Sequence, residues 1–170
     1  MTVDAPLPKS VAGIAAATAA GPAGTGPAAA RSVSRLAAVQ ALYQMDMAST
    51  DLNDVIQEFV LHRFGEQAKF DFADADTAFF TALVKGVVAR QREIDPMLDA
   101  QLAAGWRLAR IDSILRAILR SGTFELIARR DVPTGVIINE YLEVAKAFFG
   151  GDEPKVVNGV LDALAKKIRV

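Results

Sequence analysis

Apolar residues recur at helical spacing along nearly the whole chain after residue 31. In the segment 51–65 one helical face collects Leu52, Val55, Ile56, Phe59 and Val60. The same spacing returns in 74–94 with Phe79, Leu83 and Val87, and again in 108–130. No segment shows the strict alternation of apolar and polar residues that marks paired strands. The pattern predicts an all-α, single-domain bundle of six or seven helices.

Cap and turn residues divide this periodic pattern into separate helices. Ser32 or Ser34 is predicted to be the N-cap of the first helix, which is apolar on most sides and therefore expected to be central and buried. Asp95 followed by Pro96 predicts the start of a further short helix. The stretch "DVPTGVIINEYLEVAKAFFGG" could open as a strand because "VII" is β-branched, but its later spacing favours a helix closed by Gly150.

The last helix contains an unusual pair of residues. "KVVNGVLDALAKK" has helical spacing, and Asp152 with Pro154 predicts a capped start just before it. Within it, Gly159 costs roughly 1 kcal/mol relative to alanine. We therefore expect a neighbouring helix to pass too close to Gly159 for a side chain. We expect Asn158 to satisfy a buried backbone group. Both residues are predicted to be structural.

The first thirty residues differ from the rest. They are mainly Ala, Gly, Pro and Thr, with too little bulky apolar surface to offset the entropy of ordering. They predict a disordered tail over residues 1–30, followed by one folded domain over 31–170. A signal peptide is the alternative, with "VAGIAAATAA" as its apolar region, but this region lacks Leu and Phe. No run is long enough to span a membrane, and we expect a cytoplasmic protein.

The inventory of reactive side chains disfavours an enzyme. The chain has no cysteine and a single histidine, His62, on a predicted surface helix. It therefore lacks the residues for a familiar nucleophilic triad or a multi-histidine metal site. Neither a Walker-type loop nor a dinucleotide-binding loop is present. Glu140 and Glu143 lie one turn apart, as on a solvated helix face. We expect no catalytic activity, no metal and no cofactor.

Positive charge is local rather than global. The formal net charge is −1, whereas residues 101–130 carry six arginines and two acids, a net of +4. Arg31 and Arg35 lie one helical turn apart at the start of the first predicted helix. Such a pair can bind phosphates or stack on unpaired bases, although a solvated helix end has the same pattern.

Three stretches together resemble the transcription antitermination factor NusB family. They are "RSVSRLAAVQALYQMD", "RAILRSGTFELIARRDVPTGVIINEYLEVAKAF" and "KVVNGVLDALAKK", and both their order and their spacing agree with the family pattern. The resemblance runs from residue 31 to about residue 168. It implies a helical bundle that binds boxA RNA, a short single-stranded element of ribosomal RNA transcripts. The implied partners are ribosomal protein NusE and the RNA polymerase antitermination complex.

The resemblance also assigns expected roles to individual residues. Arg31 and Arg35 match positions of the arginine-rich, RNA-contacting start, and Asp152 and Lys155 match an acid and a base that border the RNA site. Tyr43 matches a residue at or near the NusE contact. On the partner-binding side, Leu115 stands where the family often has an acid, and Asp112 is the nearby carboxylate expected to contribute to NusE binding.

The arginine cluster departs from the family pattern. Three residues separate Arg31 from Arg35, where the family often has a run of arginines, so an RNA clamp of fewer arginines is expected. Arg107 and Arg110 are candidates to compensate, on charge alone. The tyrosine of the family's "Y-E-L" motif is replaced by Phe124.

Other functions stay open at this point. One alternative is an RNA-binding appendage of a ribosomal RNA cytosine methyltransferase, and another is a helical protein–protein adaptor without RNA binding. An apolar surface around Tyr43 could serve a homodimer as well as NusE.

Overall fold

Six α-helices carry the fold in residues 26–65, 72 and 74–170, which are the residues that the computed structural model describes. They are α2 (Pro27–Ala48), α3 (Leu52–Glu58), α4 (Thr77–Gln101), α5 (Ser113–Ala128), α6 (Thr134–Phe148) and α7 (Glu153–Ile168). A π-helical turn, Phe59–Arg63, continues α3, and a 3-10 turn, Leu108–Arg110, precedes α5. The prediction of an all-α bundle is confirmed. Of the tail predicted over residues 1–30, residues 1–25 lie outside the described residues.

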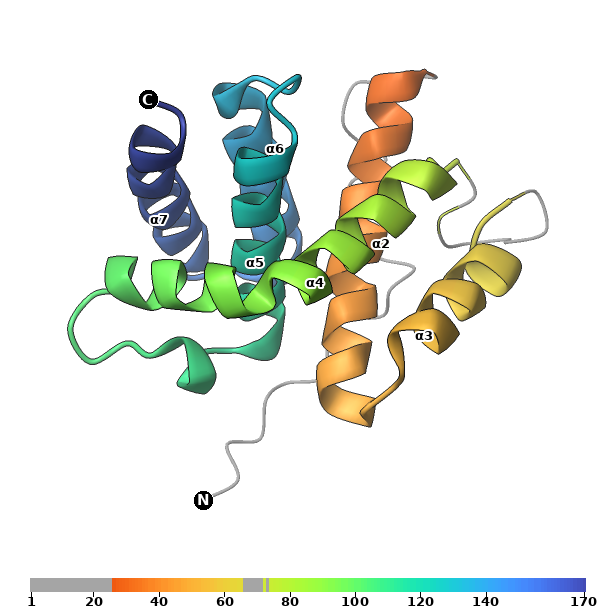
Figure 1. Ribbon diagram of the computed structural model, residues 1–170, viewed down its shortest axis with the longest axis horizontal. Coiled ribbons are helices and arrows are strands. Elements are labelled where there is room, and N and C mark those ends of the chain that lie inside the picture. The colour runs from red at the N-terminus through yellow and green to blue at the C-terminus, as the bar shows by residue number, and fades with distance from the viewer. Residues whose placement is uncertain (1–25, 66–71, 73) are drawn as a thin grey trace.

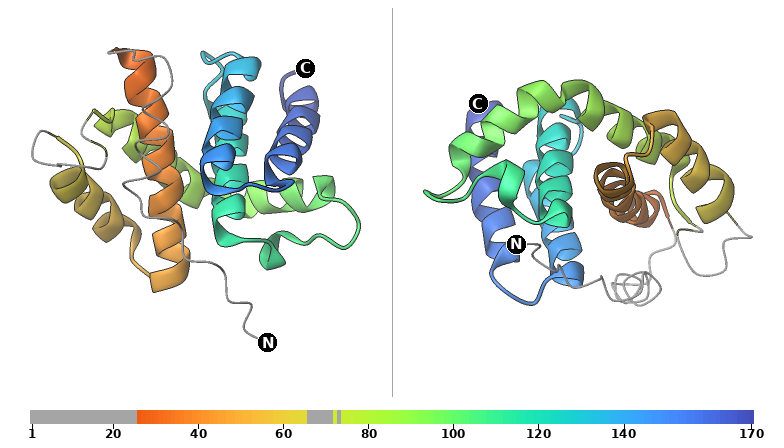
Figure 2. Two further views of the ribbon diagram at one scale, coloured as in Figure 1. Left: turned by 180° about the vertical axis from the view of Figure 1, so that it is seen from behind. Right: turned by 90° about the horizontal axis from the view of Figure 1, so that it is seen from below.

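The bundle is built around α5, which contacts α2, α4, α6 and α7. Its buried residues include Ile118, Leu119 and Leu126, and they occupy most sides of the helix. Figures 1 and 2 show α5, α6 and α7 standing side by side, with α4 crossing them and α2. In both figures the starts of α2 and α6 and the end of α5 lie at one end of the bundle. The start of α7 points toward the other end.

The first helix begins earlier than predicted. Gly26 occupies the N-cap position and Pro27 the first helical position, so residues 27–30 belong to α2 and not to a tail. Ser32 and Ser34 are therefore interior residues, not caps. The Ser34 hydroxyl instead accepts a hydrogen bond from the backbone N–H of Asp76 at 2.7 Å, which ties α2 to the N-cap of α4. The expected burial of this helix is confirmed, because residues 34–42 are all buried.

The prediction of a new helix at Asp95 and Pro96 is wrong. α4 runs unbroken through both residues to Gln101. Ile94 and Leu98 are fully buried on either side of the proline, and this packing offsets the backbone hydrogen bond that proline cannot donate. The Asp95 carboxylate does not cap a helix but accepts two hydrogen bonds of 2.8 Å from Arg120 of α5.

Segment 134–148, which could have opened as a strand, is helical throughout as α6. Its Ile137 is fully buried, so the β-branched residues serve the core of a helix. At the other side of the molecule, Phe59, Phe64, Phe72 and Phe80 form one aromatic cluster that fastens the end of α3 to α4. Ring centroids in this cluster are 4.8 to 6.2 Å apart.

Candidate functional site

Arg35 lies inside the bundle and not on its surface. Only 2% of the residue is exposed, and its Nε and Nη2 atoms donate to the two carboxylate oxygens of Glu125 at 2.8 and 2.9 Å. Tyr141 donates to the same carboxylate at 2.5 Å, and Glu140 lies 3.6 Å from Arg35 Nη1. The prediction that Arg35 contacts RNA is therefore wrong for this structure: the guanidinium is committed to a buried ion pair that joins α2, α5 and α6.

Burial and charge act on this cluster together. Burial alone would lower the pKa of Arg35, but the hydrogen bonds and the charge of Glu125 outweigh it and raise that pKa. Burial raises the pKa of Tyr141 well above its ordinary value, and the neighbouring Glu125 charge adds to this effect. Both groups therefore hold their protons throughout the neutral range. The arrangement is a fully satisfied buried network, which orients the helices that carry it.

Arg31 lies one turn before Arg35 and is only half-buried. Its guanidinium lies over the Phe79 ring, 5.3 Å from the centroid, and among the described residues it has no carboxylate within ion-pair distance. Its Nε atom is buried without a hydrogen-bond partner. Beside it, the Ser32 hydroxyl donates to Glu140 at 2.9 Å. Of the two arginines that the sequence singles out, Arg31 alone has the exposure and the spare donors that an anion needs.

Two residues missed by the sequence analysis surround Arg31. Phe79 is 5% exposed at the start of α4 and carries three guanidinium groups over its ring, those of Arg31, Arg35 and Arg129. Arg129 follows α5 and makes a two-pronged hydrogen bond to Asp131 at 3.0 and 2.9 Å. Hydrogen bonds from Arg129, helped by the charges of Arg129 and Arg31, lower the pKa of Asp131 to about 2. No sequence signal joins these residues, because they come from three separate helices.

Asp152 and Lys155 form a second exposed charged site. Their side chains are 88% and 86% exposed, and Lys155 Nζ lies 3.8 Å from the Asp152 carboxylate. Asp152 occupies the N-cap position of α7 as predicted, but its side chain makes no capping hydrogen bond. α7 runs opposite to α2, so its start is not beside the start of α2 (Figures 1 and 2). The structure thus brings Asp152 and Lys155 together but does not join them to Arg31.

The two arginines proposed to compensate for the reduced cluster lie elsewhere. Arg107 and Arg110 are exposed and precede α5, whereas Arg129 follows its last turn. They are therefore at the opposite end of α5 from the guanidinium groups around Phe79 and cannot extend that cluster.

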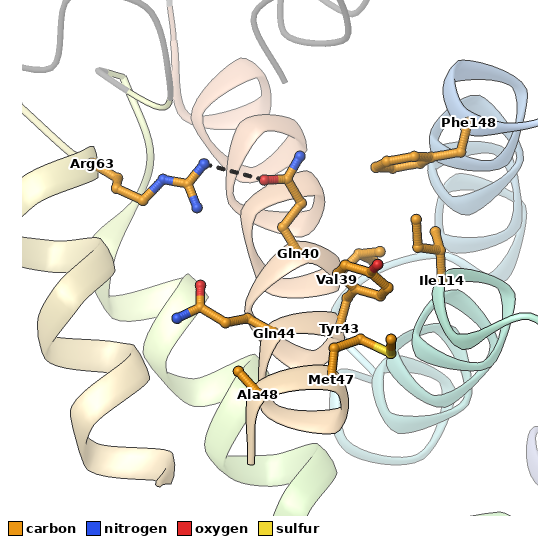
Figure 3. Close-up of a pocket in the computed structure, with 9 residues that line it drawn as sticks. All are labelled: Val39, Gln40, Tyr43, Gln44, Met47, Ala48, Arg63, Ile114 and Phe148. Carbon is orange, nitrogen blue, oxygen red and sulfur yellow. Dashed lines mark hydrogen bonds between the residues drawn. The ribbon is translucent and has the colours of Figure 1, made fainter. Parts of the chain in front are cut away.

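An apolar groove of about 260 Å³ runs along α2. Figure 3 shows Tyr43 and Met47 on the side of α2 that faces α5 and α6, and Gln40 hydrogen-bonded to Arg63 on the other side. The full lining is Val39, Gln40, Tyr43, Gln44, Met47, Ala48, Arg63, Ile114 and Phe148. Met47 is 62% exposed, which is high for a methionine in a monomer surface. Most of the residues that line this groove are apolar.

Asp112 lies two residues before Ile114, which lines this groove. Its carboxylate is the N-cap of α5 and accepts from the backbone N–H groups of Ile114 at 2.7 Å and Leu115 at 3.2 Å. Asp112 therefore stabilises the start of α5 as its N-cap residue. Its expected contribution to NusE binding stays a prediction.

The structural roles predicted for Asn158 and Gly159 are wrong. Both residues are exposed, and a Cβ atom added at Gly159 would meet nothing within 4 Å. Close approach occurs at two other glycines. A Cβ at Gly122 would lie 2.8 Å from a methyl group of Leu161, and one at Gly86 would lie inside the ring of Phe124. The cause is the register of α7, whose buried residues lie on the side opposite Gly159.

His62 is exposed on the π-helical turn, as predicted. Within the described part of the chain, no group of three His, Cys, Asp or Glu residues could hold a metal ion. In the same residues, no helix combines the length and the apolar character needed to cross a membrane.

Fold and surface together define an all-α protein with exposed charged helix ends and an apolar groove. The model of the NusB family matches residues 32–166. The chain belongs to the NusB family. Two curated relatives are both called transcription antitermination protein NusB. The protein from Bartonella henselae is 53% identical over 82% of this chain and 89% of its own length. That from Agrobacterium fabrum is 50% identical over 84% and 87%.

Solved structures have the same fold. NusB of T. maritima superposes with a TM-score of 0.69 at 28% identity, covering 85% of this chain and 94% of that chain. A chain in a crystal structure of antitermination factors NusB and NusE with double-stranded RNA superposes with a TM-score of 0.63. It is 24% identical and covers 81% of this chain and 96% of that chain. At that identity the second comparison supports the fold alone.

Proposed function

We propose that this protein is a cytoplasmic, non-catalytic antitermination factor. It binds boxA RNA of ribosomal RNA transcripts together with NusE and promotes read-through by RNA polymerase. The observation that carries this proposal is Arg31, a half-buried guanidinium without a carboxylate partner among the described residues, in a chain of the NusB family. A phosphate group can satisfy its unused donors, and unpaired bases can stack beside it.

The second site fits the same ligand. Lys155 supplies a mobile positive charge for a phosphate, and Asp152 can accept a hydrogen bond from a base edge. The two sites are separate, and a flexible single strand can reach both. The groove around Tyr43 is assigned to NusE, because its apolar lining suits a protein surface and not a phosphate backbone.

Nothing in the structure favours the two alternative functions. The curated relatives are matched over 87–89% of their own length, which leaves no room in them for a methyltransferase domain. A purely protein-binding adaptor would have no use for a guanidinium such as that of Arg31, which has no carboxylate partner within the described part of the chain.

RNA binding by single variants tests the proposal. Arg31→Ala should weaken binding of boxA RNA about tenfold, because one charge-assisted phosphate contact is lost. Arg90→Ala is the matched control, since Arg90 is a surface arginine paired with Glu93 on α4. It should stay within about twofold of the parent. Equal affinity of the Arg31→Ala and Arg90→Ala variants, measured by fluorescence anisotropy, would overturn the role of Arg31. Equal affinity of the parent for boxA and scrambled RNA would overturn boxA recognition.

A further inference from the structure

Three guanidinium groups surround the ring of Phe79, which lies at the start of α4. The centroid of Phe79 lies 5.3 Å from Arg31, 5.0 Å from Arg35 and 5.2 Å from Arg129. These arginines come from α2 and from the residue that follows α5. Like charges this close repel one another unless anions are near.

Three carboxylates accompany the three arginines, but two of them belong to Arg35. Arg35 is paired with the fully buried Glu125 and lies 3.6 Å from Glu140, whose side chain is 26% exposed. Arg129 is paired with Asp131, whereas Arg31 has no carboxylate within ion-pair distance among the described residues. The two half-buried arginines, Arg31 and Arg129, therefore share a single carboxylate, Asp131, and this part of the cluster carries one more positive than negative charge among the described residues. Such an excess attracts an anion.

The ion pair between Arg129 and Asp131 lies at the protein surface. The side chains are 28% and 58% exposed, and exposed ion pairs of this kind contribute little to stability. The backbone of Arg129, by contrast, is fixed: its N–H donates to Glu125 O at 2.9 Å, and its carbonyl accepts from Arg169 at 2.8 Å. The backbone of Arg129 is thus held in place, while the carboxylate on its guanidinium is exposed to solvent.

We propose that Arg129 is a second phosphate-binding residue of the RNA site, and that the Asp131 carboxylate occupies its guanidinium until an RNA phosphate displaces it. The inference rests on the proposed function. Asp131 stays ionised down to acid pH, so it competes with RNA throughout the neutral range. Arg31 and Arg129, which both lie beside the Phe79 ring, bind phosphates together, and this compensates for the reduced arginine run of α2.

Two substitutions of opposite sign test this inference on the full chain with labelled boxA RNA. Arg129→Ala should weaken binding about fivefold and make the slope of log affinity against log salt about 0.7 less steep, because one phosphate contact is lost. Asp131→Asn should tighten binding about threefold, since the competing charge is removed. Arg90→Ala and Glu93→Gln are matched controls from an exposed Arg–Glu pair on α4, and both should stay near the parent.

A conservative variant and distinct outcomes separate a folding defect, an error about Arg129 and an error about the RNA site. Arg129→Lys keeps the charge but loses the two-pronged fork, so it should keep the parent's salt slope and bind RNA more weakly than the parent. Asp131→Asn changes only an exposed side chain and does not depend on the ring contact. If Arg129→Ala matches Arg90→Ala while Arg31→Ala still loses affinity, the role of Arg129 is overturned and RNA binding stands. If Asp131→Asn does not tighten binding, the competition is overturned. If Arg31→Ala also has no effect, the proposed RNA site itself fails.

Discussion

Replacing Arg35 with alanine should unfold this protein far more easily, without removing an RNA contact. The substitution leaves the Glu125 carboxylate fully buried, with Tyr141 as its remaining close donor. Breaking a buried pair by removing one partner costs about 3–5 kcal/mol, because an uncompensated charge stays in the core. A typical domain has about 5–15 kcal/mol in total. Arg35→Ala should therefore remove a large part of the free energy of unfolding.

An apolar triple variant separates the effect of the buried charge on the stability from the effect of lost packing. At roughly 3 °C per kcal/mol for a domain of this size, the melting temperature should fall by about 10–15 °C. A triple variant, Arg35→Met, Glu125→Leu and Tyr141→Phe, removes every member of the network except Glu140. It should recover most of the loss, since apolar replacement of a buried ion pair is often neutral. Arg31→Ala should cost only about 1 kcal/mol, because the Phe79 ring is its one side-chain contact recorded among the described residues.

Urea unfolding followed by circular dichroism measures these free energies, and RNA anisotropy at a temperature where each variant is folded measures binding. The expected result is a large stability loss for Arg35→Ala with near-parental RNA affinity. The reasoning is refuted if Arg35→Ala unfolds within 1 kcal/mol of the parent. It is equally refuted if the folded variant loses RNA affinity as strongly as Arg31→Ala does.

Five further substitutions, one of them measured in a pH series, give independent checks. Gly159→Ala should raise the free energy of unfolding by about 0.5–1 kcal/mol, because the added Cβ atom meets open space. Gly122→Ala should lower it by about 1–3 kcal/mol, because the added Cβ atom would lie too close to Leu161. Urea midpoints that move in the opposite directions would contradict this packing. Asp152→Asn should tighten RNA binding about twofold and Lys155→Ala should weaken it, by anisotropy; the reverse order would exclude phosphate near α7. The raised pKa of Tyr141 means that the folded state holds this proton more tightly than the unfolded chain, so its stabilisation is complete below pH 10.0 and is lost above it. Tyr141→Phe should remove this alkaline loss from unfolding curves, and an unchanged loss would show that another group causes it.

The sequence predicts the helices well because each buries a regular apolar face. Helix ends are less predictable, since several residues can serve as caps. Ser34 has the right side chain for an N-cap, but its hydroxyl binds Asp76, 42 residues away, and Pro27 begins the helix. Asp95 and Pro96 look like a helix start, yet Ile94 and Leu98 keep the helix continuous through tertiary packing. Local signals cannot show partners that only the fold supplies.

The two arginines of α2 make the same point for the site. Arg31 and Arg35 look alike in the sequence, because they lie one turn apart on the same helix. Only the fold shows that Glu125, 90 residues after Arg35, forms a buried ion pair with it, whereas Arg31 stays half-buried. One signal was available: Arg35 lies within a helix that is apolar on most sides, so its burial could have been expected. Gly159 could also have been placed, because the apolar spacing of α7 puts it on the outer face. Arg129 had no such signal.

Titration of boxA RNA with and without NusE tests RNA recognition most directly. If three or four phosphates are contacted, log affinity should fall against log salt with a slope of roughly −2 to −3, at about −0.7 per phosphate. NusE should tighten binding, and a scrambled RNA should bind more weakly than boxA at every salt concentration. Binding that ignores sequence and is unchanged by NusE would contradict an antitermination function for this protein.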